Sequence, residues 1–308
     1  MIKYAIPAMY ELADLNFRLL SIKKEQPDLF YDDIEIEISY GNPQFCIWDG
    51  GRVFSSYKQS SMDNIKNIID TYNNTFNIPI RYVFTNNQLT SNEYHNRFCN
   101  LLMEIGANGF NEVVVADDNF MKYLKDKYPM YKYVSSTTKV ITNPEEAKKE
   151  INKEEYKLTC LHYDLNFNFK FLNSLNEKER AKTEFLVNPI CPAGCQFRKD
   201  HYKLNSQMVL NYGKNYSTPW CGIVENNFYP NTHKNHMTYD MIKEKYAPMG
   251  FEHFKIEGRT WNELDLALTY CEYMVKPEYK YYVLTYLIGR LIIIDQSNKL
   301  IHNIYIQV

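Results

Sequence analysis

The sequence predicts a (β/α)8 barrel of the TIM type, and three observations support this fold class. Apolar, β-branched segments of strand length recur along the 308 residues and alternate with helix-like segments. Several of the strands are continuous apolar runs, which is typical of strands covered on both faces. Eight such units fill roughly 260 residues, the size of a barrel of this kind. An open doubly wound sheet is the alternative, but no GxGxxG pattern follows the first strand.

The expected elements follow one another in regular order. Apolar residues with helical spacing follow strand two over 62–72 and strand three over 98–105. Asn143 and Pro144 have the pattern of a capped helix start. The predicted strands are Tyr4–Ala8, Ile34–Ser39, Ile80–Phe84, Glu112–Ala116, Tyr131–Ser136, Lys157–His162, Glu184–Val187 and His253–Glu257.

Two segments are longer than ordinary connections, and we expect them to form long loops that carry function. They follow strands two and seven and cover residues 41–61 and 196–247. The barrel domain is expected to span residues 1–276. Residues 277–308 would form a C-terminal extension packed on it, which begins as a helix and continues into a strand pair.

The charge balance narrows the classes of partner. Lys and Arg number 35 and Asp and Glu 37, which gives a net charge of −2. This disfavours a strongly electrostatic nucleic-acid or membrane binder. The start of the chain lacks the pattern of a secretory signal, and the most apolar run, 287–294, is too short to span a bilayer. We therefore expect a cytoplasmic protein without a membrane segment, in which the seven cysteines are thiols or metal ligands.

Four cysteines are candidate metal ligands. Cys191 and Cys195 are separated by three residues in a segment rich in Pro and Gly, which suits a turn that presents two thiolates to one metal. Cys221 lies in the long segment after the same strand, and Cys46 lies in the long loop after strand two. Four thiolates can hold a 4Fe-4S cluster, and a structural zinc is the alternative. Packing of buried thiols is the non-functional alternative, and we expect it for the remaining three: Cys99, Cys160 and Cys271.

Strand eight ends in a charged motif. Lys255 and Glu257 lie on the same face of the strand, and Arg259 follows at the mouth of the barrel. The lysine and the glutamate either pair as a structural plug or bind an acidic substrate together with Arg259. His162, at the end of strand six, is a candidate for proton transfer or substrate binding, with a purely structural role as the alternative. Conventional serine, zinc or papain-like hydrolysis has no support, since no GxSxG, HExxH or P-loop motif is present.

Four segments at and after the ends of strands five to eight carry a resemblance to peptidase family U-32, the collagenase-like peptidases. The segment that ends in the glycine and arginine of strand eight is the most specific of them. The segments are Ser135–Ala147, Asp164–Asn166, Glu184–Cys191 and Phe254–Arg259.

The resemblance implies a βα barrel with a 4Fe-4S cluster on Cys191, Cys195, Cys221 and, as the fourth ligand, Cys46. Relatives in that family include proteins for oxygen-independent hydroxylation of ubiquinone precursors or RNA bases, and others described as proteases. The cysteine spacing departs from the better-known members, because the late pair is close and the third cysteine is distant.

Three functions follow as hypotheses. The first is an iron–sulfur, hydroxylase-like or modifying enzyme that acts on a small aromatic or RNA substrate. In this hypothesis Lys255, Arg259 and His162 hold an anionic substrate, and the enzyme acts together with a partner protein of the same family. The second is a collagenase-like peptidase. The third is a non-catalytic binding protein with a structural zinc.

Overall fold

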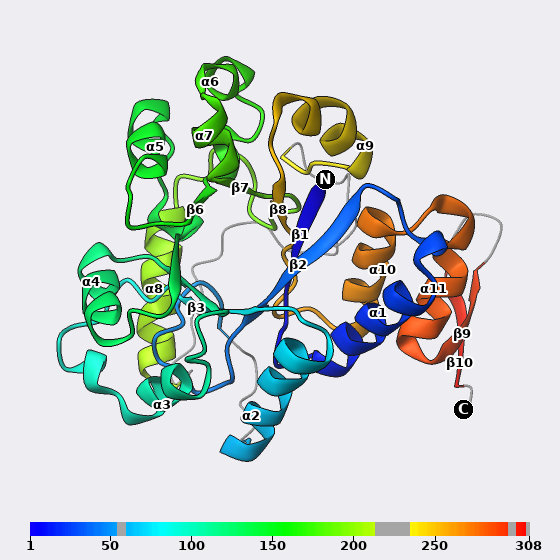
Figure 1. Cartoon of the computed structure of the whole chain (residues 1–308), viewed down its shortest axis with the longest axis horizontal. Coiled ribbons are helices and arrows are strands. Elements are labelled where there is room, and N and C mark those ends of the chain that lie inside the picture. The colour runs from blue at the N-terminus through cyan, green and yellow to red at the C-terminus, as the bar shows by residue number, and fades with distance from the viewer. Residues whose placement is uncertain (54–59, 213–234, 295–299, 306–308) are drawn as a thin grey trace.

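The chain folds into a closed barrel of eight parallel strands surrounded by helices (Figure 1), which confirms the predicted fold class. This computed structural model describes residues 1–53, 60–212, 235–294 and 300–305. Neighbouring strands pair in sequence order, and β8 closes the ring on β1. The strands are β1 (Ile2–Ile6), β2 (Ile34–Gly41), β3 (Ile80–Phe84), β4 (Glu112–Val115), β5 (Lys132–Ser135), β6 (Leu158–Leu161), β7 (Thr183–Leu186) and β8 (His253–Lys255).

The predicted strands lie where the structure has them, and no boundary differs by more than two residues. β1 ends at Ile6 rather than at Ala8, because Pro7 has no N–H to donate and Ala8 adopts a left-handed conformation with φ of 57°. β8 ends at Lys255, so Glu257 lies beyond the strand. The motif of strand eight is therefore presented at the end of the barrel rather than inside it.

Helices alternate with the strands and cover the outside of the barrel (Figure 1). Asn143 caps α5 by accepting hydrogen bonds from the N–H groups of Glu145 and Glu146 at 2.9 and 3.1 Å, as predicted. The helices are α1 (Ala13–Glu25), α2 (Met62–Asp70), α3 (Arg97–Ile105), α4 (Asp118–Lys127), α5 (Pro144–Ile151), α6 (Phe169–Ser174), α7 (Glu177–Ala181), α8 (Arg198–Leu210), α9 (Tyr239–Met241), α10 (Glu263–Met274) and α11 (Lys280–Ile288).

The long segment after β7, predicted as a loop, is partly helical, since it contains α8 and α9. The buried side of α8 mixes charged and polar residues such as Arg198 and Asn205 with apolar ones such as Met208. Because no continuous apolar stripe marks this helix, its sequence does not show the usual amphipathic period.

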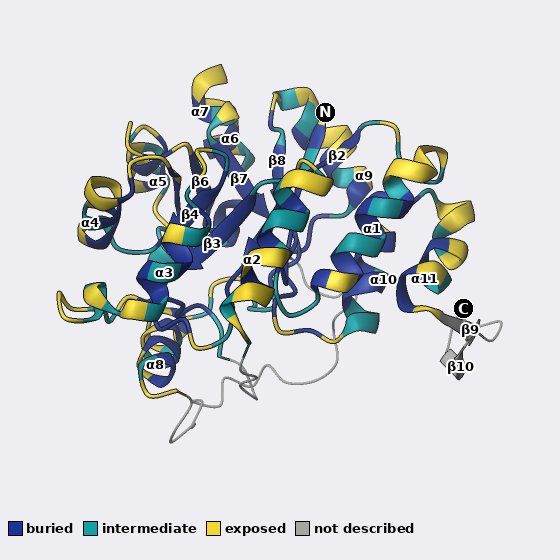
Figure 2. Cartoon of the chain, turned by 60° about the horizontal axis from the view of Figure 1, so that its bottom comes forward, coloured by how far each residue is buried: buried dark blue, intermediate teal, exposed yellow. Residues whose placement is uncertain are grey.

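Apolar clusters among the described residues stabilise the fold, and two of them surround and fill the barrel. The larger one fills the space between the strands and the surrounding helices, and Figure 2 shows these inner faces as buried. The smaller one fills the barrel lumen, where alternate residues of neighbouring strands meet. Its members are Ala5, Ile38, Tyr40, Val83, Val114, Val134 and Leu158.

The chain continues beyond the barrel through α11, which packs on α1 and α10. Strands β9 (Arg290–Ile294) and β10 (Leu300–Tyr305) then form an antiparallel pair at the edge of the molecule (Figure 1). Within the described ranges, no helix has both the length and the apolar character needed to cross a bilayer.

Candidate active site

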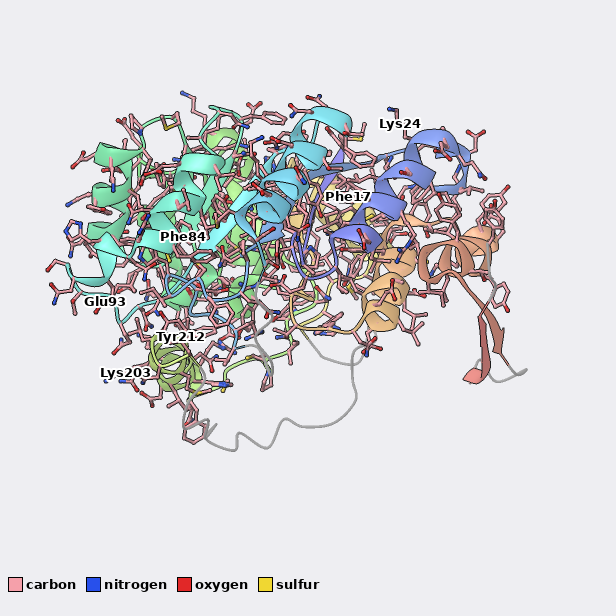
Figure 3. All side chains as sticks on the ribbon, turned by 90° about the horizontal axis from the view of Figure 1, so that it is seen from below. Phe17, Lys24, Phe84, Glu93, Lys203 and Tyr212 are labelled. Atoms are coloured by element: carbon pink, nitrogen blue, oxygen red, sulfur yellow. The ribbon has the colours of Figure 1, made fainter. Side chains whose placement is uncertain are left out.

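A hollow of about 520 Å³, part of it open to solvent, lies at the carboxyl ends of the barrel strands. This is the end at which (β/α)8 enzymes place their active sites. The lumen core closes the inner end of this hollow, and Tyr202 of α8 contributes to its wall. Figure 3 shows α8 with Lys203 pointing away from the barrel. The lining residues are Tyr40, Gly51, Arg52, Val83, Thr85, Val114, Ser136, Thr137, Thr138, Leu186, Tyr202, Lys255, Glu257 and Arg259. We refer to this hollow as the mouth pocket.

Three of the four residues predicted to be catalytic line the mouth pocket: Lys255, Glu257 and Arg259. The structural alternative, in which Lys255 and Glu257 pair with each other, is not what the structure has. Glu257 forms its ion pair with Arg52 and also accepts a hydrogen bond of 3.0 Å from the backbone N–H of Ile190. The partner of the glutamate therefore comes from the long loop after β2.

Arg259 is buried and forms an ion pair of 2.5 Å with Asp49. The second oxygen of that carboxylate accepts a hydrogen bond of 2.7 Å from the N–H of Gly50. Only Nη1 of the guanidinium takes part in a hydrogen bond with the described residues. Since a guanidinium has five N–H donors, Arg259 keeps donors for a ligand in the mouth pocket.

Lys255 is 7% exposed, and its Nζ lies 4.0 Å from the centroid of the Tyr40 ring. The hydroxyl of Tyr40 donates a hydrogen bond of 2.5 Å to the carbonyl of Ile256, which fixes the ring under the lysine. Among the described residues, no carboxylate lies within ion-pair distance of Lys255. Burial lowers the pKa of Lys255, and the nearby Glu184 opposes this shift without reversing it.

The loop between β2 and α2 is held against the end of β3, and this fixes the positions of Asp49 and Arg52. The side chain of Asn86 donates hydrogen bonds to the carbonyls of Ile47 and Ser206 at 2.9 and 3.1 Å. A Cβ atom on Gly50 would lie 2.4 Å from the Cα of Asn86, so only glycine allows this approach. The mouth pocket is therefore built from segments that are rigidly attached to the barrel and to α8.

Glu11, in the turn after β1, is a residue that the sequence reasoning missed. Both carboxyl oxygens are buried, and no other described residue forms a hydrogen bond with them. Burial raises the pKa of Glu11 to about 8, and its own backbone N–H and the charge of Arg259 only partly offset this. Its position directly after β1 is the signal that the sequence offers, because the carboxyl ends of the strands form the mouth of the barrel.

The loop that carries Cys191 and Cys195 is anchored at several points. Arg198 donates a hydrogen bond of 2.5 Å to the carbonyl of Pro192, and Asn235 donates one of 2.9 Å to the carbonyl of Cys191. Both cysteines are partly exposed. The loop therefore presents two accessible thiols in a fixed backbone.

His162, the fourth predicted catalytic residue, does not line the mouth pocket. It lies in a smaller neighbouring hollow, where its Nε2 accepts a hydrogen bond of 2.9 Å from Arg198. A guanidinium can only donate, so the imidazole is the acceptor here. Burial, followed by the charge of Arg198, lowers the pKa of His162 to about 4. The histidine is therefore neutral at pH 7 and positions Arg198, which in turn holds the cysteine loop.

Cys46 and Cys221 are not brought to the cysteine loop by the described part of the structure. The Sγ of Cys46 lies 3.6 Å from that of Cys99 in the apolar core outside the lumen. Burial raises the pKa of the Cys46 thiol well above its ordinary value, which favours the protonated thiol at this position. Cys221 lies outside the described residues. Of the residues that are described, no three histidine, cysteine or acidic side chains form a group suited to a metal.

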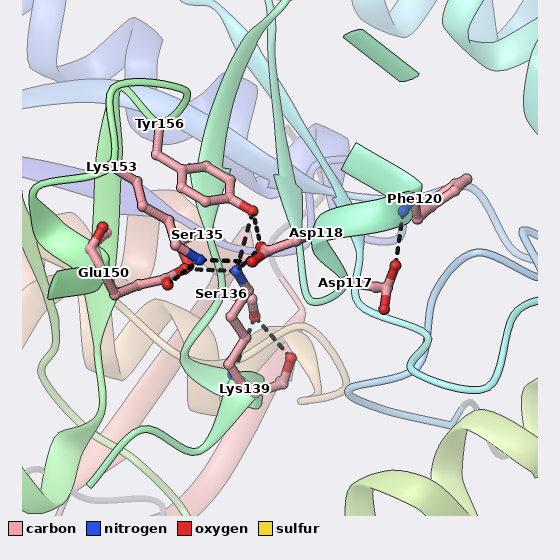
Figure 4. Close-up of polar contacts among 11 residues, drawn as sticks. Asp117, Asp118, Phe120, Ser135, Ser136, Lys139, Glu150, Lys153 and Tyr156 are labelled. Carbon is pink, nitrogen blue, oxygen red and sulfur yellow. Dashed lines mark hydrogen bonds and ion pairs between the residues drawn. The ribbon is translucent and has the colours of Figure 1, made fainter. Parts of the chain in front are cut away.

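A second polar cluster, on the outer side of β4, β5 and β6, is closed on itself (Figure 4). Lys139 contacts Asp118 and Glu150 at 2.5 and 2.6 Å, and Lys153 contacts the same two carboxylates at 2.6 Å. Tyr156 donates a further hydrogen bond of 2.6 Å to Asp118. Two cations balance two anions, so the cluster has the character of a structural network. Lys139 thus differs from Lys255, for which the described residues supply no carboxylate partner.

No protein-family model matches the chain, and no curated protein matches its sequence. Among solved structures, the U32 peptidase Mk0906 has a similar fold, with a TM-score of 0.47 and 14% sequence identity. The match covers 84% of this chain and 93% of that one. A likeness at this identity concerns the barrel alone and says nothing about the reaction.

Proposed function

We propose that the chain is a barrel enzyme that acts on a small anionic organic molecule bound in the mouth pocket. The observation that carries the proposal is the set of three basic side chains at this end of the barrel. Arg52, Lys255 and Arg259 line the pocket, whereas among the described residues only two carboxylates pair with them. An anion in the pocket would bind to the guanidinium of Arg259 beside the amine of Lys255, which has no carboxylate partner in the described part of the chain.

The pairing at the mouth leaves donors for such a ligand. Arg259 is held in place by Asp49 through one nitrogen, and its side chain lines the pocket. A guanidinium in this position suits a carboxylate or a phosphate, which it can bind through two hydrogen bonds. Hydroxyl groups of Thr85 and Ser136 also line the pocket and can contact the uncharged part of a ligand. The site thus combines a charged anchor with neutral hydrogen-bonding groups, as small-molecule sites do.

The test is calorimetric binding of a panel of small carboxylates and phosphates to the full chain. We expect at least one ligand to bind, and Arg259→Gln to weaken that binding about tenfold or more, since a hydrogen bond to a charged group contributes roughly 1.5–3 kcal/mol. Arg18→Gln is the matched control, because Arg18 also pairs with a carboxylate, Glu263, but lies on the outer helix α1. Equal weakening by both variants, or no binding by any member of the panel, would contradict the proposal.

A second candidate function is iron–sulfur chemistry of the hydroxylase-like kind at the cysteine loop, on a small aromatic or RNA substrate. The anchored backbone and the partial exposure of Cys191 and Cys195 favour it. A cluster held there by these two cysteines and Cys221 would supply electron transfer. The fourth ligand would have to be a residue other than Cys46, which packs on Cys99.

This candidate is tested by iron and sulfide analysis after strictly anaerobic purification. We expect about four irons per chain, lost in the double variant Cys191→Ser, Cys195→Ser and retained in Cys271→Ser, whose thiol is buried in the core. An iron-free chain would remove the candidate. Stoichiometric zinc would instead favour the structural-zinc alternative, and peptide cleavage that survives iron removal would favour the peptidase alternative.

A further inference from the structure

Lys255 occupies a position in which a lysine amine can react with a bound molecule. It is the last residue of β8, and it is paired in register with Leu186 of β7. Its side chain enters the mouth pocket above the lumen core, beside Val83 and Val114. The ring of Tyr40 lies directly under the amine, at 4.0 Å from the ring centroid. The amine is thus buried, fixed from one side and open to the pocket.

The surroundings make the ammonium form of Lys255 less favourable than that of a lysine in water. Burial disfavours the charge, and the guanidinium groups of Arg81 and Arg259 disfavour it further, whereas Cys160 and Glu184 act in the opposite direction. With no carboxylate partner among the described residues, the net effect is a lowered pKa for Lys255. A lysine that is desolvated and lies near other cations is the form in which this side chain serves as a nucleophile.

We propose that Lys255 forms an imine with the carbonyl carbon of a small anionic carbonyl compound whose anionic group is held by Arg259. This inference rests on the proposed function, because it needs an anion in the mouth pocket. Both groups line the same pocket, and each reaches it from the end of β8 or from the turn that follows. One segment of the chain therefore supplies both the anchor for the anion and the amine.

The reaction is a condensation without any change of oxidation state. The lone pair of the Lys255 amine attacks the carbonyl carbon, and the π electrons move to the carbonyl oxygen. The resulting carbinolamine loses that oxygen as water while the carbon–nitrogen double bond forms. One proton taken up from solvent makes the product a protonated imine. Its positive charge then lies in the same pocket as the anionic group of the substrate, so the pocket has no unbalanced charge.

The experiment is reductive trapping on the full chain. The protein is incubated with pyruvate, 2-oxoglutarate or dihydroxyacetone phosphate, reduced with sodium borohydride, and mapped by peptide mass spectrometry. We expect the mass of a reduced adduct on Lys255, at least tenfold above that on Lys139, the buried lysine with two carboxylate partners. The oxo acids and the phosphate distinguish a carboxylate from a phosphate as the anionic group. The adduct should be lost in Lys255→Met and retained in Lys139→Met.

The outcomes separate the inference from the proposed function. If calorimetry detects a ligand of this panel in the pocket and borohydride leaves Lys255 unlabelled, imine formation is overturned and the anion site stands. If no compound binds and none is trapped, both the imine at Lys255 and the proposed anion site are overturned. Labelling spread evenly over the lysines of the chain also overturns the inference. Because the adduct is mapped on the unmodified protein, the test holds even where a variant fails to fold.

Discussion

The two ends of the barrel lumen differ in how their buried charged groups are paired. We call the end near the amino ends of the strands the floor and the opposite end the mouth. Near the amino ends of the strands, Arg81 is fully buried and contacts the carboxylates of Glu112 and Glu184 at 2.8 and 2.5 Å. Lys157 adds a second cation on Glu112. At the mouth, Lys255 and Glu11 are buried without a partner of opposite charge among the described residues.

The difference separates structural charge from charge that is available for chemistry. At the floor, burial alone would raise the pKa of Glu184, but the charges of Arg81 and Lys255 and the hydrogen bond from Arg81 together outweigh it, and the pKa is lowered. The carboxylates at the floor therefore stay ionised and balance the charges of the cations beside them. At the mouth, the effect of burial is only partly offset, so the pKa values of Lys255 and Glu11 are shifted toward the neutral forms. Groups of the second kind are expected where a ligand supplies the missing partner.

The largest expected effect on stability comes from removing the buried guanidinium of Arg81 at the floor. Arg81→Met leaves Glu184 buried without its ion-pair partner and Glu112 with Lys157 alone, so we expect the free energy of unfolding at pH 7 to fall by about 3–5 kcal/mol. Since folding lowers the pKa of Glu112 and of Glu184, their contribution to stability is present above about pH 4.5 and is lost as the pH falls further. Urea unfolding at pH 7 measures the loss. A change below about 1 kcal/mol would remove the contrast between floor and mouth.

The next effect is the pH dependence of stability caused by the buried carboxyl of Glu11 at the mouth. With a pKa of about 8 in the folded chain, Glu11 binds its proton more tightly there than in the unfolded chain. Its contribution to stability is therefore full below about pH 4.5 and is lost as the pH rises through 8. Glu11→Gln removes the ionisation, and we expect it to be more stable than the parent by roughly 3 kcal/mol or more at pH 9. A parent protein with the same stability at pH 6 and pH 9 would refute the assignment.

A smaller effect is expected at Lys255. Because folding lowers its pKa, the unfolded chain binds more protons between the folded and unfolded pKa values, and stability rises with pH in that window. Lys255→Met has no ammonium group to bury, so its stability lacks this pH dependence. We expect the variant to be more stable than the parent by about 1–2 kcal/mol at pH 7. The gain should shrink as the pH approaches 10. Thermal unfolding across this pH range measures it, and a destabilised variant would instead indicate that the lysine has a structural partner.

The barrel and the residues at the end of its eighth strand were predictable, since both depend on local patterns. Strand periodicity placed Lys255 and Arg259 near the mouth, and the ends of the strands followed from it. The pairing of Glu257 with Arg52 was not predictable, because it depends on how the loop after β2 folds over the barrel. The packing of Cys46 on Cys99 was not predictable for the same reason, because it brings a loop residue against helix α3, which is distant in the sequence.

Glu11 shows the limit of reasoning from residue type. A glutamate in a turn is ordinarily exposed, and nothing next to it in the sequence indicates that its carboxyl is buried. The burial results from packing among segments far apart in the chain. Whether a charged residue is paired is likewise a property of the assembled barrel, which is why the floor and the mouth cannot be told apart in the sequence.

The most direct test of the central claim is the titration of Lys255 itself. Heteronuclear NMR of the lysine side chains, with the Lys255 signal assigned by its absence in Lys255→Met, gives the pKa in the folded protein. We predict a midpoint below the ordinary lysine value of about 10.4. A midpoint at or above that value would show that the buried amine is stabilised as an ammonium ion and would contradict the contrast between the floor and the mouth.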